Sequence, residues 1–381
     1  MAKTYTAMGL MSGTSLDGVD LSIIESDGIT EYSPILNRYF EYDKALIQKI
    51  LKIRDKISNS EELKLNANEI KDLEREITLF HVRAVQETLE NSSIDIDLIG
   101  LHGQTIFHNP KQKISKQIGD GKLLSQLTKK KVVFDFRQND LKNGGQGAPL
   151  TPIFHNVLAN KVNKKFNLRF PINILNIGGI ANITITTDWK DLWLVNKIYA
   201  YDIAPGNCLI DEWIRNNSKK KYDKEGLIGR SGKIDKLILN QALDNFNLNS
   251  YYGKSLDIKD FNIFFAKGLS LENGAATITG FTAKLIADGM NYSHGMSRTN
   301  TYKWLVCGGG RKNKYLLESI KNNFEKIDIE SIDKYEIDGD FIESQAFAFL
   351  AIRSLVGLPI SFPSTTGCKK SISGGVITEN F

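Results

Sequence analysis

Near its N-terminus this chain has a glycine-rich turn between two segments with strand character. Residues 9–20 read GLMSGTSLDGVD, and the following residues 21–25, LSIIE, alternate as a half-buried strand does. The stretch therefore predicts a strand, a tight turn and a second strand. It is not a Walker A loop, because no Gly-Lys-Ser/Thr follows and no helix begins there. Two interpretations stay open for the turn alone: a phosphate-binding turn, or a hairpin with a polar tip.

Two further glycine turns follow apolar strands later in the chain. Residues 172–186 read INILNIGGIANITIT, and residues 302–310 read YKWLVCGGG. The first two turns are about 165 residues apart, which suggests two related halves rather than a short-period repeat. Glycine lets backbone N–H groups come close to phosphate oxygens, so three such turns point to a nucleotide site. The alternative is three unrelated tight turns, because glycine is common at strand ends.

Composition limits the classes of partner. The chain has 381 residues, with 49 basic and 44 acidic side chains, and its net charge of +5 is mild. The lysine clusters at 129–131 and 219–221 contain no aromatic residues, so we expect solvated faces and no nucleic-acid partner. No apolar run reaches the roughly 18 residues of a membrane span, so we expect no membrane partner. The three cysteines, Cys208, Cys307 and Cys368, lack metal-site spacing and predict a reducing cytoplasm without a structural disulfide or zinc.

The length favours two domains, and the periodic segments indicate an α/β chain. Residues 25–42 predict short strands with turns at 27–28 and 33–34, and residues 43–89 predict helices with a break near 57–60. Residues 255–293 predict at least two helices. Residues 343–351 begin a helix that we expect to be the last of the chain.

A longer series of motifs runs in order from residue 9 to about residue 367. The motifs are SGTSLDGVD at 12–20, HGQT at 102–105, DFR at 135–137, GGQGAPL at 144–150, LNIGG at 175–179, Asp202 with PGN at 205–207, VCGGG at 306–310, and residues 343–351. In these motifs the chain resembles the 1,6-anhydro-N-acetylmuramic acid kinase family.

The resemblance implies an α/β, two-domain, actin-like or sugar-kinase-like ATPase fold with mixed sheets flanked by helices and an active-site cleft between the domains. Domain I would comprise residues 1–133 and about 342–381, and domain II about 134–341. The implied reaction is ATP-dependent: the 1,6-anhydro ring of 1,6-anhydro-N-acetylmuramic acid is hydrolysed and the freed 6-oxygen is phosphorylated. The products would be N-acetylmuramic acid 6-phosphate and ADP, in cell-wall recycling. The resemblance also implies a cytoplasmic homodimer whose partners are ATP and a small sugar.

The glycine turns would then bind ATP with Mg²⁺. The predicted ATP-binding residues are Gly13, Thr14, Ser15, Leu16, Asp17, Gly18, Val19, Asp20, Gly178, Gly179, Gly308, Gly309 and Gly310. Of these, Asp17 and Asp20 carry the hard carboxylate oxygens that suit Mg²⁺, and we expect them to reach it through water.

Two carboxylates are the expected catalytic residues. The resemblance makes Asp202 the base that deprotonates water, although an Asp before Pro-Gly is as readily a turn former. It makes Glu343 a second carboxylate that orients or deprotonates the water. Position alone would make Glu343 a favourable acid at a helix N-terminus.

Four polar residues are the expected sugar contacts: Arg137, Gln146, Asn207 and His102. Arg137 could bind the lactyl carboxylate of the sugar or form a surface salt bridge, and His102 could instead be a satisfied histidine at a strand end. Asn176 could also bond to sugar or phosphate.

The chain departs from the family pattern at two places. Many members have Thr-Gly-Arg-Glu before Phe-Asn, whereas residues 256–260 here read LDIKD, so Ile258 stands where an arginine is common. Arg311 follows the third glycine turn, where small residues are frequent, and could stack on adenine.

Two other functions fit the same fold. One is a sugar kinase with another acceptor, in which Asp202 would deprotonate a substrate hydroxyl. The other is an actin-like ATPase that gates a protein partner, although the sequence shows no separate peptide-binding domain.

Overall fold

The computed structural model divides into two compact units. It describes residues 3–13, 16–188, 198–246, 255–294 and 303–381. Unit 1 comprises Met1–Val157 and Phe341–Phe381, and unit 2 comprises Leu158–Asp340. The chain leaves unit 1 within helix α6 (Pro152–Phe166). Residues 134–157, which the sequence analysis assigns to domain II, thus lie in unit 1, where Gln146 bonds to Thr366 of the C-terminal part of the chain.

Unit 1 is built on a seven-stranded mixed sheet. Its strands are β1 (Tyr5–Ser12), β2 (Gly18–Ser26), β3 (Tyr32–Glu41), β4 (Leu98–Asn109), β5 (Ile114–Ile118), β6 (Lys131–Phe134) and β12 (Val376–Thr378). The order is β12-β6-β4-β1-β2-β3, with β5 paired to β4. Strands β1, β2 and β3 form an antiparallel meander, and β4 and β6 continue the sheet in parallel from β1. The first glycine turn therefore joins the central strand β1 to its neighbour β2.

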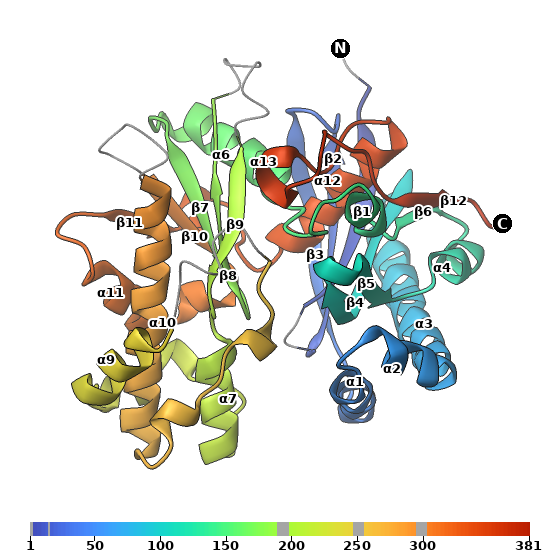
Figure 1. Ribbon diagram of the computed structural model, residues 1–381. Coiled ribbons are helices and arrows are strands. Elements are labelled where there is room, and N and C mark those ends of the chain that lie inside the picture. Colours follow the sequence, from blue (N-terminus) through green and yellow to red (C-terminus); the bar gives the residue numbers. More distant parts are fainter. Residues whose placement is uncertain (1–2, 14–15, 189–197, 247–254, 295–302) are drawn as a thin grey trace. The chain divides into compact units, whose positions relative to one another are not determined.

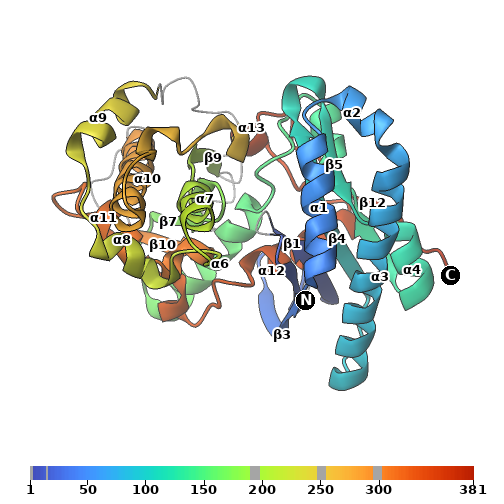
Figure 2. The ribbon, with the colours of Figure 1, turned by 90° about the horizontal axis from the view of Figure 1, so that it is seen from below.

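Helices flank this sheet. They are α1 (Lys44–Lys56), α2 (Ser60–Leu65), α3 (Ala67–Ser92), α4 (Gly121–Thr128), α5 (Gln138–Lys142), α12 (Ile342–Leu355), α13 (Pro363–Thr366) and the 3-10 turn η1 (Pro110–Gln112). Figure 2 shows α1, α3 and α4 grouped together along the unit, and α3 contacts both α1 and α4. The predicted break near 57–60 is confirmed, and a second break at Asn66 separates α2 from α3.

Helix α12 packs closely on the sheet because glycine occupies two facing positions. A Cβ on Gly9 would lie 1.9 Å from the carbonyl oxygen of Ser344, and one on Gly100 would lie 2.3 Å from that of Phe347. Met8 points to the opposite face of β1, into the core that α1 and α3 complete. The glycines thus set the distance between α12 and the central strands.

Unit 2 is built on a five-stranded mixed sheet. Its strands are β7 (Ile172–Ile177), β8 (Ala181–Ile185), β9 (Tyr199–Ala204), β10 (Lys303–Cys307) and β11 (Asp328–Ser331). Its helices are α7 (Cys208–Asn217), α8 (Leu227–Ser231), α9 (Lys236–Asp244), α10 (Leu271–His294) and α11 (Lys314–Lys321), with 3-10 turns η3 (Lys224–Gly226), η5 (Ile258–Asp260), η6 (Phe264–Ala266), η7 (Gly309–Lys312) and η8 (Ile332–Tyr335). In Figure 1 the long helix α10 runs along this unit, and its buried face joins α7 and strands β7 to β9 in one apolar core.

The two sheets share one topology. In unit 2, β7, β8 and β9 form an antiparallel meander, and β10 and β11 extend in parallel from β7. The order β11-β10-β7-β8-β9 repeats β6-β4-β1-β2-β3 of unit 1. The prediction of two related halves is therefore confirmed, as is the two-domain α/β fold with mixed sheets and flanking helices.

Three local predictions were wrong. Residues 32–41 form one strand without a turn at 33–34, because Pro34 lies in the edge strand β3 beside a register shift, where a missing N–H is tolerated. Within residues 255–293 the structure has one α-helix, α10, preceded by two 3-10 turns. Helix α12 is followed by α13 and is not the last helix.

Candidate functional site

The tip of the β1–β2 hairpin is fixed through two carbonyl groups. The Gly13 carbonyl accepts hydrogen bonds from the Leu16 N–H at 3.3 Å and from Gln104 Nε2 at 3.0 Å. The Asp17 carbonyl accepts one from the Tyr42 N–H at 2.8 Å. Leu16 has a φ of 58°, in the left-handed region that tight turns use. Strands β1 and β2 thus pair as the predicted hairpin, with Leu16 bonded back to Gly13.

Only part of the predicted phosphate contacts can be located in this turn. Thr14 and Ser15 lie outside the described residues. Leu16 and Val19 are buried in the core of unit 1, at 2% and 0% exposure, so only their backbone groups are candidates for a ligand.

Carboxylates gather around Tyr39 beside this turn. Burial raises the pKa of the Tyr39 phenol, and the negative charges of Asp17, Glu41 and Asp20 raise it further. A Cβ on Gly18 would lie 2.8 Å from the Tyr39 ring, so the ring lies against the hairpin backbone. The turn therefore carries negative charge on one side, as a cation site requires.

A buried polar cluster lies next to the end of β1. The Ser12 hydroxyl is 2.8 Å from the Tyr42 hydroxyl and 3.4 Å from His81 Nε2, and all three side chains are buried. Burial lowers the pKa of His81 to about 4, so its imidazole is neutral at pH 7. The Ser12 hydroxyl is thus bound inside the protein and supports the turn from within.

Arg137 and His102, both predicted sugar contacts, bond to each other. Arg137 donates from Nε at 3.2 Å and from one terminal nitrogen at 2.8 Å to His102 Nε2, and from the other terminal nitrogen to the Gly147 carbonyl at 2.7 Å. His102 Nδ1 lies 2.7 Å from the Gly103 carbonyl. Burial, and then the charge of Arg137, hold the pKa of His102 well below its usual value. His102 is therefore a neutral acceptor that orients the guanidinium, which fits a supporting role better than direct contact with a sugar.

The loop that contains Gln146 lies against the C-terminal part of unit 1. The Gln146 N–H donates to the Thr366 carbonyl at 2.8 Å, and its side chain is half-buried. Arg137, His102 and the backbone of this loop thus form one connected group within unit 1.

In unit 2, the second glycine turn packs on the Pro-Gly-Asn segment. The Asn207 N–H donates to the Gly178 carbonyl at 2.8 Å, and the Cys208 N–H donates to the Gly179 carbonyl at 3.2 Å. Gly206 has a φ of 46°, and a Cβ there would lie 2.5 Å from the Gly178 carbonyl oxygen. Glycine at 206 is therefore required by both conformation and space.

The third glycine turn packs against the strand that leads into the second glycine turn. Gly308 has a φ of 76°, and a Cβ on it would lie 2.4 Å from Asn176 Oδ1 and 2.7 Å from the Ile177 carbonyl oxygen. A Cβ on Gly310 would lie 2.2 Å from the Ile177 side chain, and Asn207 Nδ2 donates to the Ile177 carbonyl at 3.3 Å. The structure thus brings Gly178, Gly308 to Gly310 and Asn207 together, as a nucleotide site built from two turns would need.

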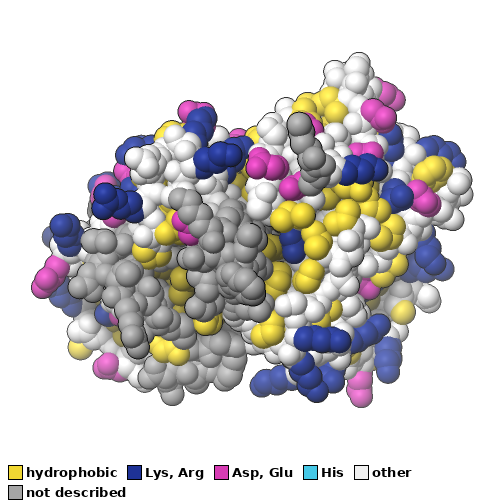
Figure 3. All heavy atoms as spheres, turned by 90° about the horizontal axis from the view of Figure 1, so that it is seen from above, with side chains coloured by type: hydrophobic (Ala, Val, Ile, Leu, Met, Phe, Trp, Pro, Cys, Tyr) yellow, Lys and Arg dark blue, Asp and Glu magenta, His cyan; other side chains and the backbone are white. Residues whose placement is uncertain are grey.

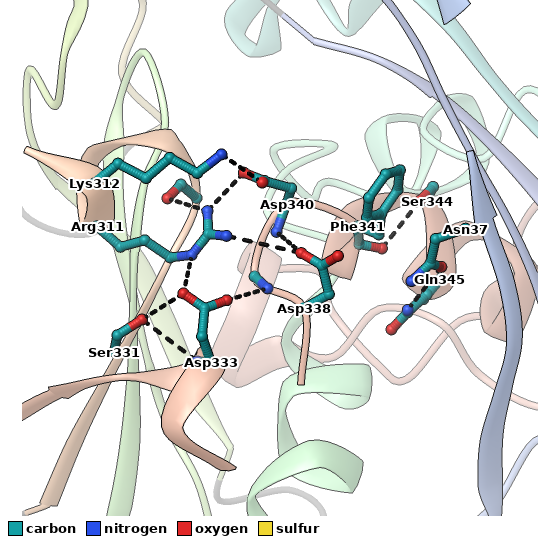
Figure 4. Close-up of polar contacts among 12 residues, drawn as sticks. Asn37, Arg311, Lys312, Ser331, Asp333, Asp338, Asp340, Phe341, Ser344 and Gln345 are labelled. Carbon is teal, nitrogen blue, oxygen red and sulfur yellow. Dashed lines mark hydrogen bonds and ion pairs between the residues drawn. The ribbon is translucent and has the colours of Figure 1, made fainter. Parts of the chain in front are cut away.

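Arg311, directly after the third turn, is engaged by carboxylates (Figure 4). Its Nε donates to Asp333 at 2.7 Å, and one terminal nitrogen donates to Asp340 at 2.6 Å and to the Gly308 carbonyl at 3.2 Å. Asp338 lies 3.7 Å from the other terminal nitrogen, and the Arg311 side chain is only 4% exposed. Arg311 thus fastens the glycine turn to the segment that ends unit 2. The structure gives it this role in place of the expected stacking on adenine.

Asp202, the predicted base, lies on β9 and is 8% exposed. Its Oδ2 accepts a hydrogen bond from the Leu256 N–H at 2.8 Å, and the Ser255 hydroxyl is 3.4 Å away. The segment that departs from the family pattern at Ile258 therefore holds Asp202 through its backbone, so this contact does not depend on the side chain at 258.

Glu343 lies in the first turn of α12, which is fixed to the sheet by polar contacts. Ser344 Oγ lies 2.7 Å from Ser22 Oγ and donates to the Phe341 carbonyl at 3.0 Å, and Ser22 in turn donates to Asn37 at 2.8 Å. Figure 4 shows Asn37, Ser344 and Phe341 gathered at this helix start. The first turn of α12, which bears Glu343, is thus anchored to the sheet through the buried Ser344.

Comparison with known proteins shows the family of this chain. The family model for anhydro-N-acetylmuramic acid kinase matches residues 5–380. The chain belongs to this family. It is 51% identical to the anhydro-N-acetylmuramic acid kinase of Pelagibacter ubique, with 100% of both chains covered. It is 38% identical to that of Methylobacterium nodulans (97% of this chain and 98% of the relative) and 36% identical to that of Brucella canis (99% of each).

For a member of the anhydro-N-acetylmuramic acid kinase family, ATP is the phosphoryl donor. Within the described ranges, no three His, Cys, Asp or Glu side chains come together as metal ligands. A metal held through water by Asp17 and Asp20 stays a prediction.

The helices and one face of the molecule were compared with the expectations from composition. No helix in the part of the chain that the structure describes is long and apolar enough to span a membrane. On the face in Figure 3, Lys and Arg side chains are interspersed with Asp and Glu, in keeping with the mild net charge.

Sequence reasoning missed several residues that support the site. Gln104 lies within the recognised HGQT motif, so its side-chain bond to the first turn could have been suspected. No local sequence pattern marks the other supporting residues, because their roles depend on contacts between segments far apart in the chain. They are Tyr42, His81, Asp140 and Thr366.

Proposed function

We propose that this protein converts 1,6-anhydro-N-acetylmuramic acid, ATP and water to N-acetylmuramic acid 6-phosphate and ADP. The observation that carries the proposal is the family match over residues 5–380, which includes every motif of the site. The convergence of two glycine turns with Asn207 in unit 2 supports it physically, because close backbone approach is what a polyphosphate needs.

In this proposal Asp202 is the general base. The Leu256 N–H holds one carboxylate oxygen and so fixes the plane of the group. Asp202 takes a proton from water as the water oxygen bonds to the anomeric carbon, C1. The bond between C1 and O6 breaks, and its electron pair stays on O6. O6 then bonds to the γ-phosphorus of ATP, and ADP leaves with the electrons of the broken P–O bond. The proton on Asp202 passes to solvent.

Glu343 is the second catalytic residue of the proposal. Its carboxylate would accept a hydrogen bond from the water, which fixes the direction of attack and adds negative charge near the departing proton. The anchoring of α12 through Ser344 and Ser22 limits the rotation of the first helical turn.

The phosphates would be held by the backbone of Gly13, Gly18 and the turn at 178–179, and the turn at 308–310 would lie beside the base and ribose. Asp17 and Asp20 are hard oxygen donors on the hairpin, so they fit Mg²⁺ bound through water. When bound, Mg²⁺ would supply neutralisation of the phosphate charge.

The sugar would be held by Arg137, Gln146 and Asn207, with His102 behind Arg137. The guanidinium is suited to the lactyl carboxylate, because its planar set of N–H groups matches two carboxylate oxygens. The bonds from Arg137 to His102 and Gly147 orient it with uncharged acceptors.

An isotope experiment tests the reaction. The purified protein is incubated with ATP, Mg²⁺ and 1,6-anhydro-N-acetylmuramic acid in ¹⁸O-labelled water, and the product is analysed by mass spectrometry. We expect one ¹⁸O at C1 and none in the phosphate bridge. A phosphorylated product without label would refute coupled hydrolysis and favour a kinase for another kind of acceptor. Absence of ADP formation above background would refute the kinase itself.

We also propose that the protein works as a homodimer in the cytoplasm, as the resemblance implies. The three free thiols of Cys208, Cys307 and Cys368 fit a reducing compartment. Light scattering that gives a monomer mass at the assay concentration would contradict the dimer.

A further inference from the structure

The loop that follows α5 is fastened by two buried side chains from different parts of unit 1. Asp140 Oδ2 accepts a hydrogen bond from the Gly147 N–H at 2.7 Å, and Oδ1 accepts one from the Thr366 hydroxyl at 2.7 Å. The Thr366 carbonyl accepts the Gln146 N–H at 2.8 Å. Asp140 is 2% exposed and Thr366 is 0% exposed. The C-terminal turn α13 is thus bonded once to the loop, through the Thr366 carbonyl, and once to the Asp140 side chain that holds the loop.

The loop passes directly over the Asp140 carboxylate. A Cβ on Gly145 would lie 2.1 Å from Asp140 Oδ2, and the Gly145 N–H donates to the Asp140 carbonyl at 2.9 Å. Glycine is therefore needed at 145 for the loop to reach its anchor. This accounts for one glycine of the GGQGAP motif by packing within unit 1.

Asp140 is connected to Arg137 through a single residue, Gly147. The Gly147 N–H is used by Asp140, and the Gly147 carbonyl accepts the Arg137 guanidinium at 2.7 Å. Any shift of Gly147 therefore moves an acceptor that orients Arg137. The neighbouring Gln146 is tied to the same anchor through Thr366.

We propose that Asp140 and Thr366 are positioning residues for the sugar-binding side of the site. They act through Gly147 and Gln146 on the orientation of Arg137, and the C-terminal turn α13 is thereby part of the substrate site. The inference rests on the proposed function, in which Arg137 binds the acidic group of the sugar.

The expected fall in kcat/KM follows from the strength of the hydrogen bonds to the Asp140 carboxylate. Hydrogen bonds to a charged group are each worth about 1.5–3 kcal/mol, which corresponds to a factor of roughly 10 to 100 in an equilibrium constant. Thr366→Val keeps the shape of the side chain and removes the hydroxyl donor. We expect kcat/KM for the anhydro sugar to fall about tenfold or more, with KM for ATP changed less than about twofold.

Three further variants complete the experiment. Thr366→Ser keeps the hydroxyl and should stay within about threefold of the unaltered protein. Asp140→Asn replaces one acceptor oxygen with an amide N–H, which would face either the Gly147 N–H or the Thr366 hydroxyl. We expect it to lower kcat/KM for the sugar as Thr366→Val does. Thr88→Val removes a hydroxyl that is buried in α3 and bonds to the Ala84 carbonyl, and should leave both KM values unchanged.

The outcomes separate the inference from the proposed function. A folded Thr366→Val protein, verified by thermal melting, with unchanged kcat/KM for the sugar would overturn the positioning role. So would equal rises in KM for sugar and ATP, because these would indicate general damage. If Thr366→Val does not fold, the decision falls to Asp140→Asn, whose unchanged kcat/KM would overturn the role. Unaltered protein that forms no ADP with this sugar would instead refute the proposed function.

Discussion

Acidification should destabilise this protein well above the pH at which carboxylates titrate, because several histidines are buried in the neutral form. Burial lowers the pKa of His81 from 6.5 to about 4 and that of His155 from 6.5 to about 3. Both side chains are almost fully buried, at 0% and 1% exposure. His102, also buried, has its pKa lowered by the same cause and by Arg137.

The direction follows from proton binding in the two states. A folded pKa below the unfolded value means that the unfolded chain binds more protons between pH 6.5 and about 4. The contribution to stability is complete above pH 6.5 and is lost as the pH falls through this window. With one pKa unit worth about 1.4 kcal/mol, each of the two histidines costs about 2 kcal/mol at pH 5 relative to pH 8. Together they remove about 4 kcal/mol, a large part of the roughly 5–15 kcal/mol that stabilises a typical domain.

Urea unfolding, followed by circular dichroism at pH 8, 7, 6 and 5, measures this loss. His155→Gln should reduce the fall in unfolding free energy between pH 8 and pH 5 by about 2 kcal/mol. Thr88→Val, which removes a buried group that does not titrate, should shift the free energy equally at every pH. A fall smaller than about 1 kcal/mol in the unaltered protein would refute the reasoning, because the histidines would then titrate alike in both states.

Three further outcomes test the site. Asp202→Asn should lower turnover by a factor of about 100 or more and leave ATP affinity, measured by calorimetry, nearly unchanged; a near-normal rate would exclude Asp202 as the base. Gly308→Ala places a Cβ 2.4 Å from a side-chain oxygen and should destabilise the protein by about 3 kcal/mol or more in thermal melts. Gly357→Ala has a similar φ of 73° and open space and should cost only about 1 kcal/mol, so equal losses would contradict the steric argument. Arg311→Met removes a side chain that is 4% exposed and should cost about 3 kcal/mol in urea unfolding. Lys312→Met removes a side chain that is 60% exposed and pairs with the same Asp340, and should cost less than about 1 kcal/mol. A small effect at both sites would show that the ion pairs of Arg311 contribute little.

Much of the fold was accessible from the sequence because it depends on local pattern. The alternation in residues 21–25 and the glycines at 178–179 mark hairpins, and both hairpins are present as β1–β2 and β7–β8. The helix break near 57–60 was equally local. The prediction of a turn at 33–34 was wrong because Pro34 is tolerated in an edge strand. The order of strands in the sheet decides which strand lies at the edge, and local sequence does not show that order.

For the candidate site, too, some residues could be predicted from local motifs and others could not. Asp202 and the glycine turns could be named from motifs, since the chemistry of phosphates and water restricts the residue types. The partners that orient them could not be named, because each comes from a distant segment: Leu256 for Asp202, and Ser22 for the helix start that bears Glu343.

Residue types at fixed spacing along one segment were enough to predict the two glycine hairpins, the helix break and the family. Which polar groups are buried together depends instead on contacts between segments that are far apart in the chain. The tertiary structure made His102 a neutral acceptor for Arg137, bound Arg311 to carboxylates, and tied the loop at 144–147 to Asp140 and Thr366. The physical reason is that hydrogen bonds, ion pairs and the cost of burial depend on distances between segments, which the folding of each unit sets.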